Sequence, residues 1–201
     1  FLKQFPDHRE PQNTELLREK SEILPLGLNL NQFNLSPEGP KPKEAVLLWN
    51  HRWEYDKDPD LFFKVMFQLA DEGLAFKLVV LGRDYHKMPP VFAEAKDKLQ
   101  DKILHFGYAE SKQHYGKWLK IADILPVTNR QDFFGGSIVE AIYCGCYPIL
   151  PDRLAYPEHI PAALRKEHLY QNTEELVQKL RSAIHRIQEI RMDKSYPNFV
   201  G

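Results

Sequence analysis

The stretch 129–137 carries the strongest chemical signal in the sequence. It combines the carboxylate Asp132 with two aromatic residues and the consecutive glycines Gly135 and Gly136, and it runs into a segment with helical spacing. Glycines at a helix start leave backbone N–H groups unobstructed, and the helix dipole adds partial positive charge there. Because this combination is typical of phosphate binding, we expect Gly135, Gly136 and Ser137 to contact a phosphate group.

Glu140 lies one helical turn further along, and two interpretations of it stay open. Its carboxylate would project toward the same edge of the fold, at a reach suited to the two adjacent hydroxyls of a ribose. Alternatively, residues 137–140 fit a capping box, in which Glu140 only accepts a hydrogen bond from the amide of an N-cap residue, Ser137. Spacing alone does not separate ribose binding from helix capping.

A second polar loop supplies two cations of different reach, Arg52 and Lys57, five positions apart. Facing a helix N-terminus they would suit a diphosphate, whereas the alternative is a pair of solvated surface charges. Asp56 and Asp58 flank Lys57 as a divalent metal site would require. However, Asp58 followed by Pro59 is typical of an N-cap and a first helical position. We therefore assign both aspartates to helix capping and expect ligand binding without a metal or other cofactor.

Other catalytic arrangements are missing from the sequence. Eight histidines are scattered without the spacing of a metal site, and only His51 lies in a loop expected at the ligand edge. Cys144 and Cys146 form no disulfide framework and have no zinc spacing, so we predict reduced thiols around a glycine that ends a helix. The sequence contains no nucleophile elbow, no phosphate-loop lysine motif and no G-x-G-x-x-G fingerprint.

The elements that must position these residues alternate along the chain from residue 45 onward. Short apolar runs without alternation indicate strands that are buried on both faces, as in a parallel sheet covered by helices. Strands are predicted at 45–50, 76–81, 103–106, 124–127, 147–150 and near 168–170. Helices are predicted at 60–72, 90–101, 111–121 and 136–143, and in a last segment with Leu176, Leu180, Ile184 and Ile187 at helical spacing. The fold class is therefore α/β, a doubly wound, Rossmann-like parallel sheet, whose ligands bind beyond the carboxyl ends of the strands.

Length and charge exclude several classes of protein. The chain of 201 residues suits one domain plus a tail. Its 27 Lys and Arg against 28 Asp and Glu give a net charge of −1, which excludes a globally basic surface for nucleic acid. No apolar run approaches the roughly 18 residues of a membrane helix. No signal-peptide pattern follows Phe1, so we predict a cytoplasmic protein and expect the chain to be a fragment.

Several blocks occur in an order that resembles the donor-nucleotide domain of retaining glycosyltransferases of the two-domain GT-B type. The segment 25–29 resembles the family's opening block, Pro-x-Gly followed by Val or Leu and Asp or Asn. Arg52 and Lys57 match the basic pair, although Asn50 and His51 stand where a glycine is commoner. The resemblance implies that Arg52 and Lys57 hold the diphosphate of a nucleotide-sugar and assist catalysis.

The remaining blocks extend the resemblance over nearly the whole chain. Asp132 and Glu140 match two acidic residues eight positions apart, and 141–148 matches the Ala-x-x-x-Gly-x-Pro that follows them. The resemblance implies that Glu140 holds the ribose and that Asp132, a catalytic residue, lies near the sugar hydroxyls. The first acidic residue is more often Glu in the family. Gly107 and Tyr108 are expected beside the base.

The loops 49–59 and 130–136 are similar to those of the tRNA-queuosine mannosyltransferase family. This resemblance implies GDP-mannose as donor and the queuosine of a tRNA as acceptor, reached through an N-terminal acceptor domain that the chain lacks. Residues 1–22 are then a remnant of the inter-domain segment, and 23–201 form the donor-binding domain. The alternatives are a GT-B enzyme with a UDP-sugar and another acceptor, a nucleotide-sugar epimerase, and a non-enzymatic interaction module.

Overall fold

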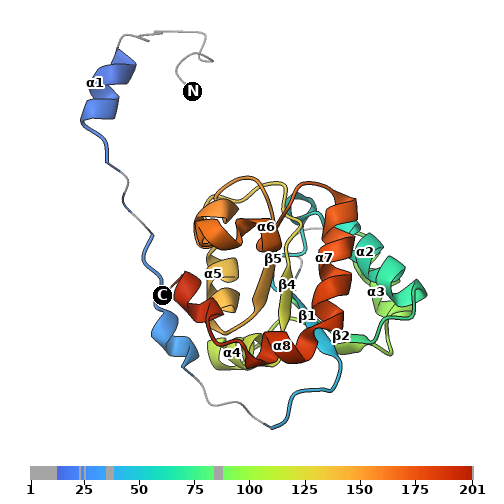
Figure 1. Cartoon of the computed structure of the whole chain (residues 1–201). Helices are drawn as coiled ribbons and strands as arrows, with labels where there is room; N and C mark the ends of the chain where they lie inside the picture. The colour runs from blue at the N-terminus through green and yellow to red at the C-terminus, as the bar shows by residue number, and fades with distance from the viewer. Residues whose placement is uncertain (1–12, 23, 25, 35–38, 84–87, 201) are drawn as a thin grey trace.

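The fold is built on a six-stranded sheet whose neighbouring strands pair in parallel (Figure 1). The computed structural model of the chain describes residues 13–22, 24, 26–34, 39–83 and 88–200. The strands are β1 (Ala45–Trp49), β2 (Phe76–Leu81), β3 (Ile103–Gly107), β4 (Ile124–Pro126), β5 (Tyr147–Pro151) and β6 (Leu169–Tyr170). Their spatial order, β3-β2-β1-β4-β5-β6, confirms the predicted doubly wound α/β sheet.

Helices cover both faces of this sheet. They are α1 (Asn13–Glu19), α2 (Pro59–Asp71), α3 (Val91–Lys98), α4 (Lys112–Ile121), α5 (Gly136–Tyr143), α6 (Arg165–His168), α7 (Thr173–His185) and α8 (Ile187–Met192). Helices α2, α3 and α7 lie on one side of the sheet, and α4 and α5 lie on the other (Figure 1). The strand order reverses between β1 and β4, so a ligand site is expected at the carboxyl ends of these two strands.

Two predicted helices end differently from their sequence patterns. Helix α3 ends at Lys98 rather than at residue 101, because Leu99 leaves the helical region and its carbonyl accepts a turn hydrogen bond from Lys102. The last predicted helix is broken at Arg186, which separates α7 from α8. Ile187 is buried nevertheless, so the apolar spacing identified the core side of both helices.

Two tryptophans fix the loop that follows β1 through hydrogen bonds and packing. The Trp49 indole donates a hydrogen bond of 3.0 Å to the carbonyl of His51, and the Trp53 indole donates one of 3.2 Å to the carbonyl of Leu81. Both indoles are buried and pack against Phe92. The backbone of this loop is therefore tied to the hydrophobic core and to the end of β2.

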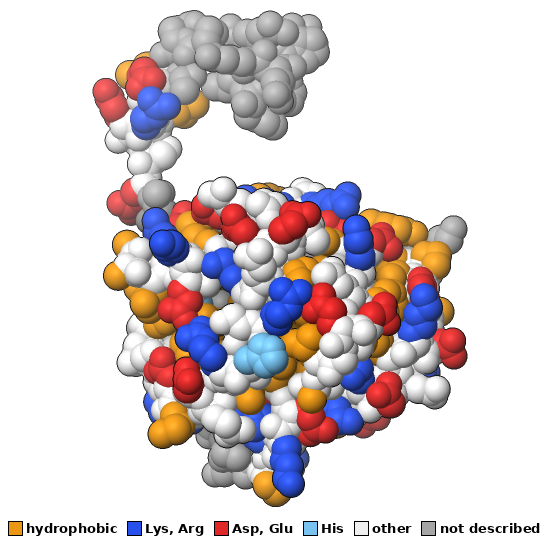
Figure 2. All heavy atoms as spheres, turned by 45° about the vertical axis from the view of Figure 1, so that its right-hand side comes forward, with side chains coloured by type: hydrophobic (Ala, Val, Ile, Leu, Met, Phe, Trp, Pro, Cys, Tyr) orange, Lys and Arg blue, Asp and Glu red, His pale blue; other side chains and the backbone are white. Residues whose placement is uncertain are grey.

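The segment before the sheet includes α1, which contains Leu16 and Leu17 and stands apart from the sheet in Figure 1. Pro25 of the opening block and residues 35–38 lie outside the described residues. Acidic and basic side chains alternate over the face in Figure 2, in keeping with the balanced charge. In the described ranges, no helix has the length and apolarity needed to cross a bilayer.

Candidate functional site

Two adjoining hollows open at the carboxyl edge of the sheet, the first between the loops after β1 and β4 and the second among the segments after β1, β2 and β3. The first has a volume of about 820 Å³ and the second about 460 Å³. Residues that line the first include Arg52, Glu54, Asp56, Lys57, Asp132, Gly136 and Ser137. Residues that line the second include Gly82, Arg83, Tyr108, Ser111, Lys112 and Tyr115. Asn50, His51 and Arg52 line both hollows, so the start of the loop after β1 forms their common boundary.

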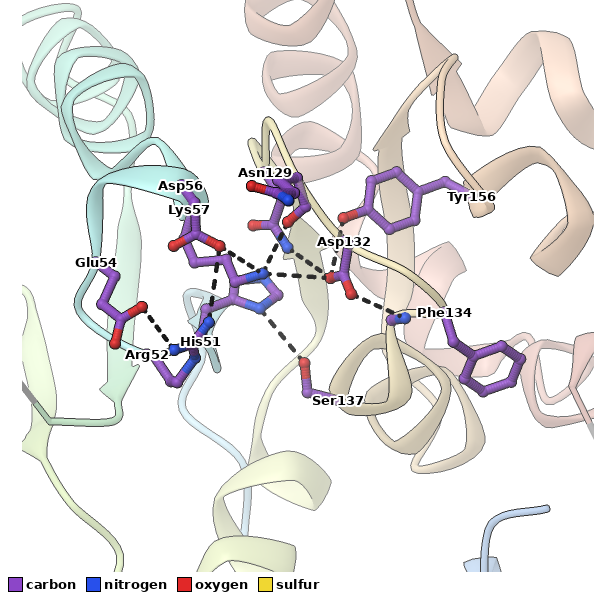
Figure 3. A network of polar contacts seen from close by, with 12 residues as sticks. His51, Arg52, Glu54, Asp56, Lys57, Asn129, Asp132, Phe134, Ser137 and Tyr156 are labelled. Atoms are coloured by element: carbon purple, nitrogen blue, oxygen red, sulfur yellow. Dashed lines mark hydrogen bonds and ion pairs between the residues drawn. The ribbon is translucent and has the colours of Figure 1, made fainter. Parts of the chain in front are cut away.

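Lys57 joins the two loops that form the first hollow (Figure 3). It lies in a short 3-10 turn after β1, and its Nζ donates a hydrogen bond of 2.9 Å to the carbonyl of Gln131 after β4. The same ammonium lies 3.1 Å from the carboxylate of Asp56 and 3.7 Å from that of Asp132. Its side chain is only 11% exposed. Lys57 is therefore a buried cation of the hollow rather than a solvated surface charge.

Arg52 is the more accessible cation. Its side chain is 52% exposed and lies 2.6 Å from the carboxylate of Glu54 and 3.7 Å from that of Asp56. Exposed ion pairs of this kind contribute little, roughly 0–1 kcal/mol, so a stronger anion can displace these carboxylates at small cost. The structure thus brings the predicted pair, Arg52 and Lys57, to one hollow.

Of the two aspartates beside Lys57, only Asp58 caps a helix. Asp58 adopts a left-handed conformation with φ 52° at the start of α2, and its carboxylate accepts the amide of Leu61. It also holds the guanidinium of Arg130 through hydrogen bonds of 2.7 and 3.0 Å. The prediction of a cap at Asp56 was wrong, because Asp56 lies in the preceding turn and pairs with Lys57 and Arg52.

The carboxylate of Asp132 is held by three groups of its surroundings (Figure 3). One oxygen accepts the amide of Gly135 at 3.1 Å, and the other accepts Asn129 at 3.0 Å and the Tyr156 hydroxyl at 3.2 Å. Burial raises the pKa of Asp132, but the Lys57 ammonium and the Asn129 and Tyr156 hydrogen bonds outweigh it, so that the pKa lies below its usual value. Asp132 is therefore an anion that fixes the loop leading into α5.

Helix α5 begins two residues earlier than a capping box at Ser137 would require. Gly135 is the N-cap, with φ 82°, and Ser137 is the second helical residue rather than the cap. A Cβ atom at Gly135 would meet Ile138 and Tyr156, so the tight turn requires glycine. The Gly135 amide already bonds to Asp132, which leaves the amides of Gly136 and Ser137 as the first-turn donors beside the hollow.

Glu140 makes a different contact from the one a cap would make. It lies in the interior of α5, and its Oε2 accepts the Tyr115 hydroxyl of α4 at 3.1 Å, beside the second hollow. The capping interpretation is therefore wrong. Burial raises the pKa of Glu140, and the Tyr115 hydrogen bond opposes this effect. Its binding to a ribose remains a prediction.

The two residues expected beside a base lie at the end of β3. Gly107 is the last residue of the strand, with φ 142°, and Tyr108 lines the second hollow. The Tyr108 ring is 56% exposed and lies 4.6 Å below the Arg83 guanidinium. An exposed ring at the wall of a hollow can stack on a flat ligand, but this contact also remains a prediction.

Sequence reasoning assigned no role to Asn50, His51 and Tyr115. Asn50 donates hydrogen bonds to the carbonyl of Ser137 at 2.7 Å and to the Tyr115 hydroxyl at 3.3 Å, which connects β1 to α5 and α4. Burial, and then the Lys57 ammonium, lower the pKa of His51 to about 3. The signal for Asn50 and His51 was their place directly after a buried strand. Tyr115 has no such local signal.

No group of three metal-binding side chains occurs within the described ranges. Of the carboxylates that line the first hollow, Asp56 and Asp132 face the ammonium of Lys57, and Glu54 pairs with Arg52. The charges of this site therefore suit an anionic ligand that is held by cations and backbone amides.

Comparison with known proteins places the chain in a family. The model of the family "Glycosyl transferases group 1" matches residues 31–194, and the chain belongs to this family. A curated relative, the tRNA-queuosine alpha-mannosyltransferase of Drosophila melanogaster, is 34% identical over 209 residues. The match covers 99% of this chain and 54% of the relative, so the chain spans about half the length of that protein.

Solved structures show the same fold at low identity. Sucrose-phosphate synthase from Thermosynechococcus elongatus superposes with a TM-score of 0.71 at 18% identity, covering 94% of this chain and 51% of that one. The C-terminal domain of the group 1 glycosyl transferase LpcC from Francisella tularensis has a TM-score of 0.67 at 18% identity, covering 87% and 96%. These similarities confirm the predicted GT-B type of α/β domain.

Proposed function

We propose that this chain is the donor-binding domain of a retaining hexosyltransferase that moves mannose from GDP-mannose to queuosine in tRNA. The observation that carries the proposal is the position of Lys57, a buried ammonium in the same hollow as Arg52 and the first amides of α5. Two cations and a helix N-terminus around one cavity match a diphosphate. The relative's name supports mannose as the sugar and queuosine as the acceptor.

The chemistry follows from where charge develops. In the transfer, the bond between the sugar's anomeric carbon and the β-phosphate oxygen breaks, and a new bond forms to an acceptor hydroxyl, which loses its proton. Negative charge grows on the leaving phosphate while the sugar gains oxocarbenium character. Arg52, Lys57 and the amides of Gly136 and Ser137 would stabilise that charge as fixed donors, without a metal ion. That the anomeric carbon keeps its configuration is inferred only from the resemblance to retaining enzymes of the GT-B type.

The second hollow would receive the nucleoside. Glu140 would accept hydrogen bonds from the ribose hydroxyls, and Tyr108 and Gly107 would border the base. Asp132 would lie near the hydroxyls of the sugar in the first hollow, while its carboxylate continues to hold the loop before α5. The acceptor-binding part, and any contact with tRNA in the cytoplasm, would belong to the half of the enzyme that the relative has in addition.

Isothermal titration of the chain with GDP, UDP, ADP and GDP-mannose tests the donor. We expect GDP and GDP-mannose to bind at least tenfold more tightly than UDP and ADP. Tighter binding of UDP would favour the alternative of a UDP-sugar enzyme with another acceptor. Binding of none of the four would contradict the donor site and would favour the non-enzymatic interaction module. Turnover of a nucleotide-sugar into its epimer would favour the epimerase.

A transfer assay with labelled GDP-mannose and queuosine-containing tRNA tests the acceptor. We expect residues 1–201 to bind donor but to transfer no sugar, because GT-B catalysis needs a second domain to close over the donor and exclude water. A longer protein that includes the preceding half should label the tRNA. Robust transfer by residues 1–201 alone would contradict the assignment of acceptor binding to the other half of the enzyme.

A further inference from the structure

The buried side-chain polar atoms that lack a hydrogen-bond partner are clustered. Across the described part of the chain there are three such atoms, Asn50 Oδ1, His51 Nε2 and Asn129 Oδ1. All three belong to the loops that follow β1 and β4, and Asn50 and His51 line both hollows. Native proteins pair nearly all buried polar groups, so an unpaired cluster at a cavity calls for a ligand that completes it.

His51 is the member that is best placed to meet a ligand. Its side chain is buried, with the residue 5% exposed, and its carbonyl is anchored by the Trp49 indole. The ring meets the Trp49 ring edge-on at 5.3 Å, and Nδ1 lies 3.4 Å from the Ser137 hydroxyl (Figure 3). That contact is long for a hydrogen bond, so Ser137 holds the ring only weakly.

The charges around His51 keep its ring neutral. Burial and the Lys57 ammonium lower the pKa of His51 to about 3, and the carboxylates of Asp132 and Asp56 only partly oppose them. A neutral imidazole has one N–H donor and one acceptor nitrogen. Buried N–H groups are left unpaired more rarely than acceptors, so we assign the proton to Nδ1, facing Ser137. Nε2 is then an acceptor without a donor.

Because Nε2 of His51 is an acceptor, only a ligand group that donates a hydrogen bond can pair with it. The oxygens of a diphosphate are acceptors at neutral pH and are matched by Arg52, Lys57 and the amides of α5. The groups of a GDP-sugar that can donate to Nε2 are the hydroxyls of its two sugars and the N–H groups of guanine, and the base is expected beside Tyr108 in the second hollow. His51 lines both hollows, but the polar groups around its ring, Lys57, Asp132 and Ser137, line only the first. Tyr115, which bonds to Glu140, lines only the second. The hydroxyl therefore belongs to the sugar rather than to the ribose.

We propose that His51 recognises the transferred hexose, and that its Nε2 accepts a hydrogen bond from a hydroxyl group of this sugar. This inference rests on the proposed function and adds a residue that distinguishes a nucleotide-sugar from the nucleotide alone. It explains why a buried imidazole with an unpaired nitrogen occupies the boundary between the two hollows. Asn50 Oδ1, on the preceding residue, is a second buried acceptor that lacks a partner.

Titration calorimetry with GDP-mannose and GDP on wild type and His51→Phe tests the inference. Losing one buried hydrogen bond should weaken GDP-mannose about fivefold to tenfold, while GDP should change by less than twofold. His168→Phe is the matched control, because His168 is also buried and its Nδ1 meets the carbonyl of Pro148, away from both hollows. It should leave both affinities unchanged.

Two outcomes would overturn the inference while leaving the proposed function intact. One is unchanged GDP-mannose affinity in a folded His51→Phe protein, and the other is an equal loss for GDP and GDP-mannose. If no nucleotide binds to wild type, the proposed function itself fails. Should His51→Phe not fold, wild type is titrated with GDP-sugars lacking the 2-, 3-, 4- or 6-hydroxyl. One of the four must then bind about fivefold to tenfold more weakly, and equal affinity for all four would reject the contact.

Discussion

The hydroxyl of Tyr115 on α4 donates a hydrogen bond of 3.1 Å to Glu140 Oε2 on α5, at the edge of the second hollow. This bond uses one carboxylate oxygen and fixes the orientation of the other. No further hydrogen bond to the Glu140 carboxylate is present in the described part of the chain. A carboxylate oriented in this way and only partly satisfied is suited to a ligand with adjacent hydroxyl groups.

The Glu140→Gln variant separates ribose binding from a structural role. Glutamine can still accept the Tyr115 hydroxyl, so we expect the melting temperature of the empty protein to change little. Its amide donor would face a ribose hydroxyl in a desolvated site, which costs on the order of 1–3 kcal/mol, so GDP affinity should fall about tenfold or more. A dideoxyribose analogue should bind both proteins equally. Normal GDP affinity in the folded variant would remove Glu140 from the site.

How far the sequence predicts this site depends on how local each interaction is. The cap at Asp58 follows from Asp-Pro chemistry within three residues, and the sequence predicted it correctly. The burial of Lys57 depends on the carbonyl of Gln131, 74 residues away, so the sequence left a solvated charge open as an alternative. The order of the strands places these two loops together, which is why the fold class identified the site's position.

Two errors have a physical reason in backbone geometry. The capping box at Ser137 failed because Gly135 adopts a left-handed conformation and starts the helix earlier, supported by the Asp132 carboxylate. The assignment of Asp56 to capping failed because a 3-10 turn directs it to Lys57 instead. Neither turn has a periodic pattern that sequence reasoning could detect.

Arg52→Ala and Lys57→Ala should each weaken GDP far more than guanosine. A charge-assisted contact to a phosphate contributes roughly 1.5–3 kcal/mol, about tenfold to a hundredfold in affinity. Lys57→Ala should also lower the melting temperature, because its ammonium joins the two loops through Gln131. Lys64→Ala, an exposed lysine of α2, serves as the control and should bind both ligands normally. Equal losses for guanosine and GDP would indicate damage to the fold rather than a lost phosphate contact.

Nucleotide binding should not require a divalent metal. Arg52 and Lys57 supply the positive charge, while Asp58 is occupied by the start of α2 and by Arg130, and Asp56 by the two cations. We expect GDP affinity, measured by calorimetry, to be the same within twofold in EDTA and in millimolar magnesium or manganese. Loss of binding in EDTA that magnesium or manganese restores would show that the aspartates beside Lys57 hold a metal.

The neutral state of His51 predicts how stability depends on pH. Burial and Lys57 lower its pKa to about 3 in the folded protein, against 6.5 for an ordinary histidine, so the unfolded chain binds more protons between these values. The folded protein therefore has its full free energy of unfolding, as far as His51 is concerned, above pH 6.5. It loses stability progressively as the pH falls toward 3, because the unfolded chain takes up a proton that the folded protein does not. Between pH 7.5 and pH 5 the contribution of His51 to the free energy of unfolding should decrease by about 2 kcal/mol, since each pH unit below 6.5 corresponds to about 1.4 kcal/mol.

Urea unfolding of wild type and His51→Phe over this pH range measures the effect. Other groups, including His168 with its lowered pKa and Glu140 with its raised pKa, contribute equally to both proteins and cancel in the comparison. The difference in unfolding free energy should therefore move by about 2 kcal/mol in favour of the variant when the pH falls from 7.5 to 5. Parallel curves for the two proteins would mean that His51 takes up a proton in the folded state as readily as in the unfolded chain. The acceptor role of its Nε2 would then be lost below pH 6.5, because a protonated imidazole has no acceptor nitrogen.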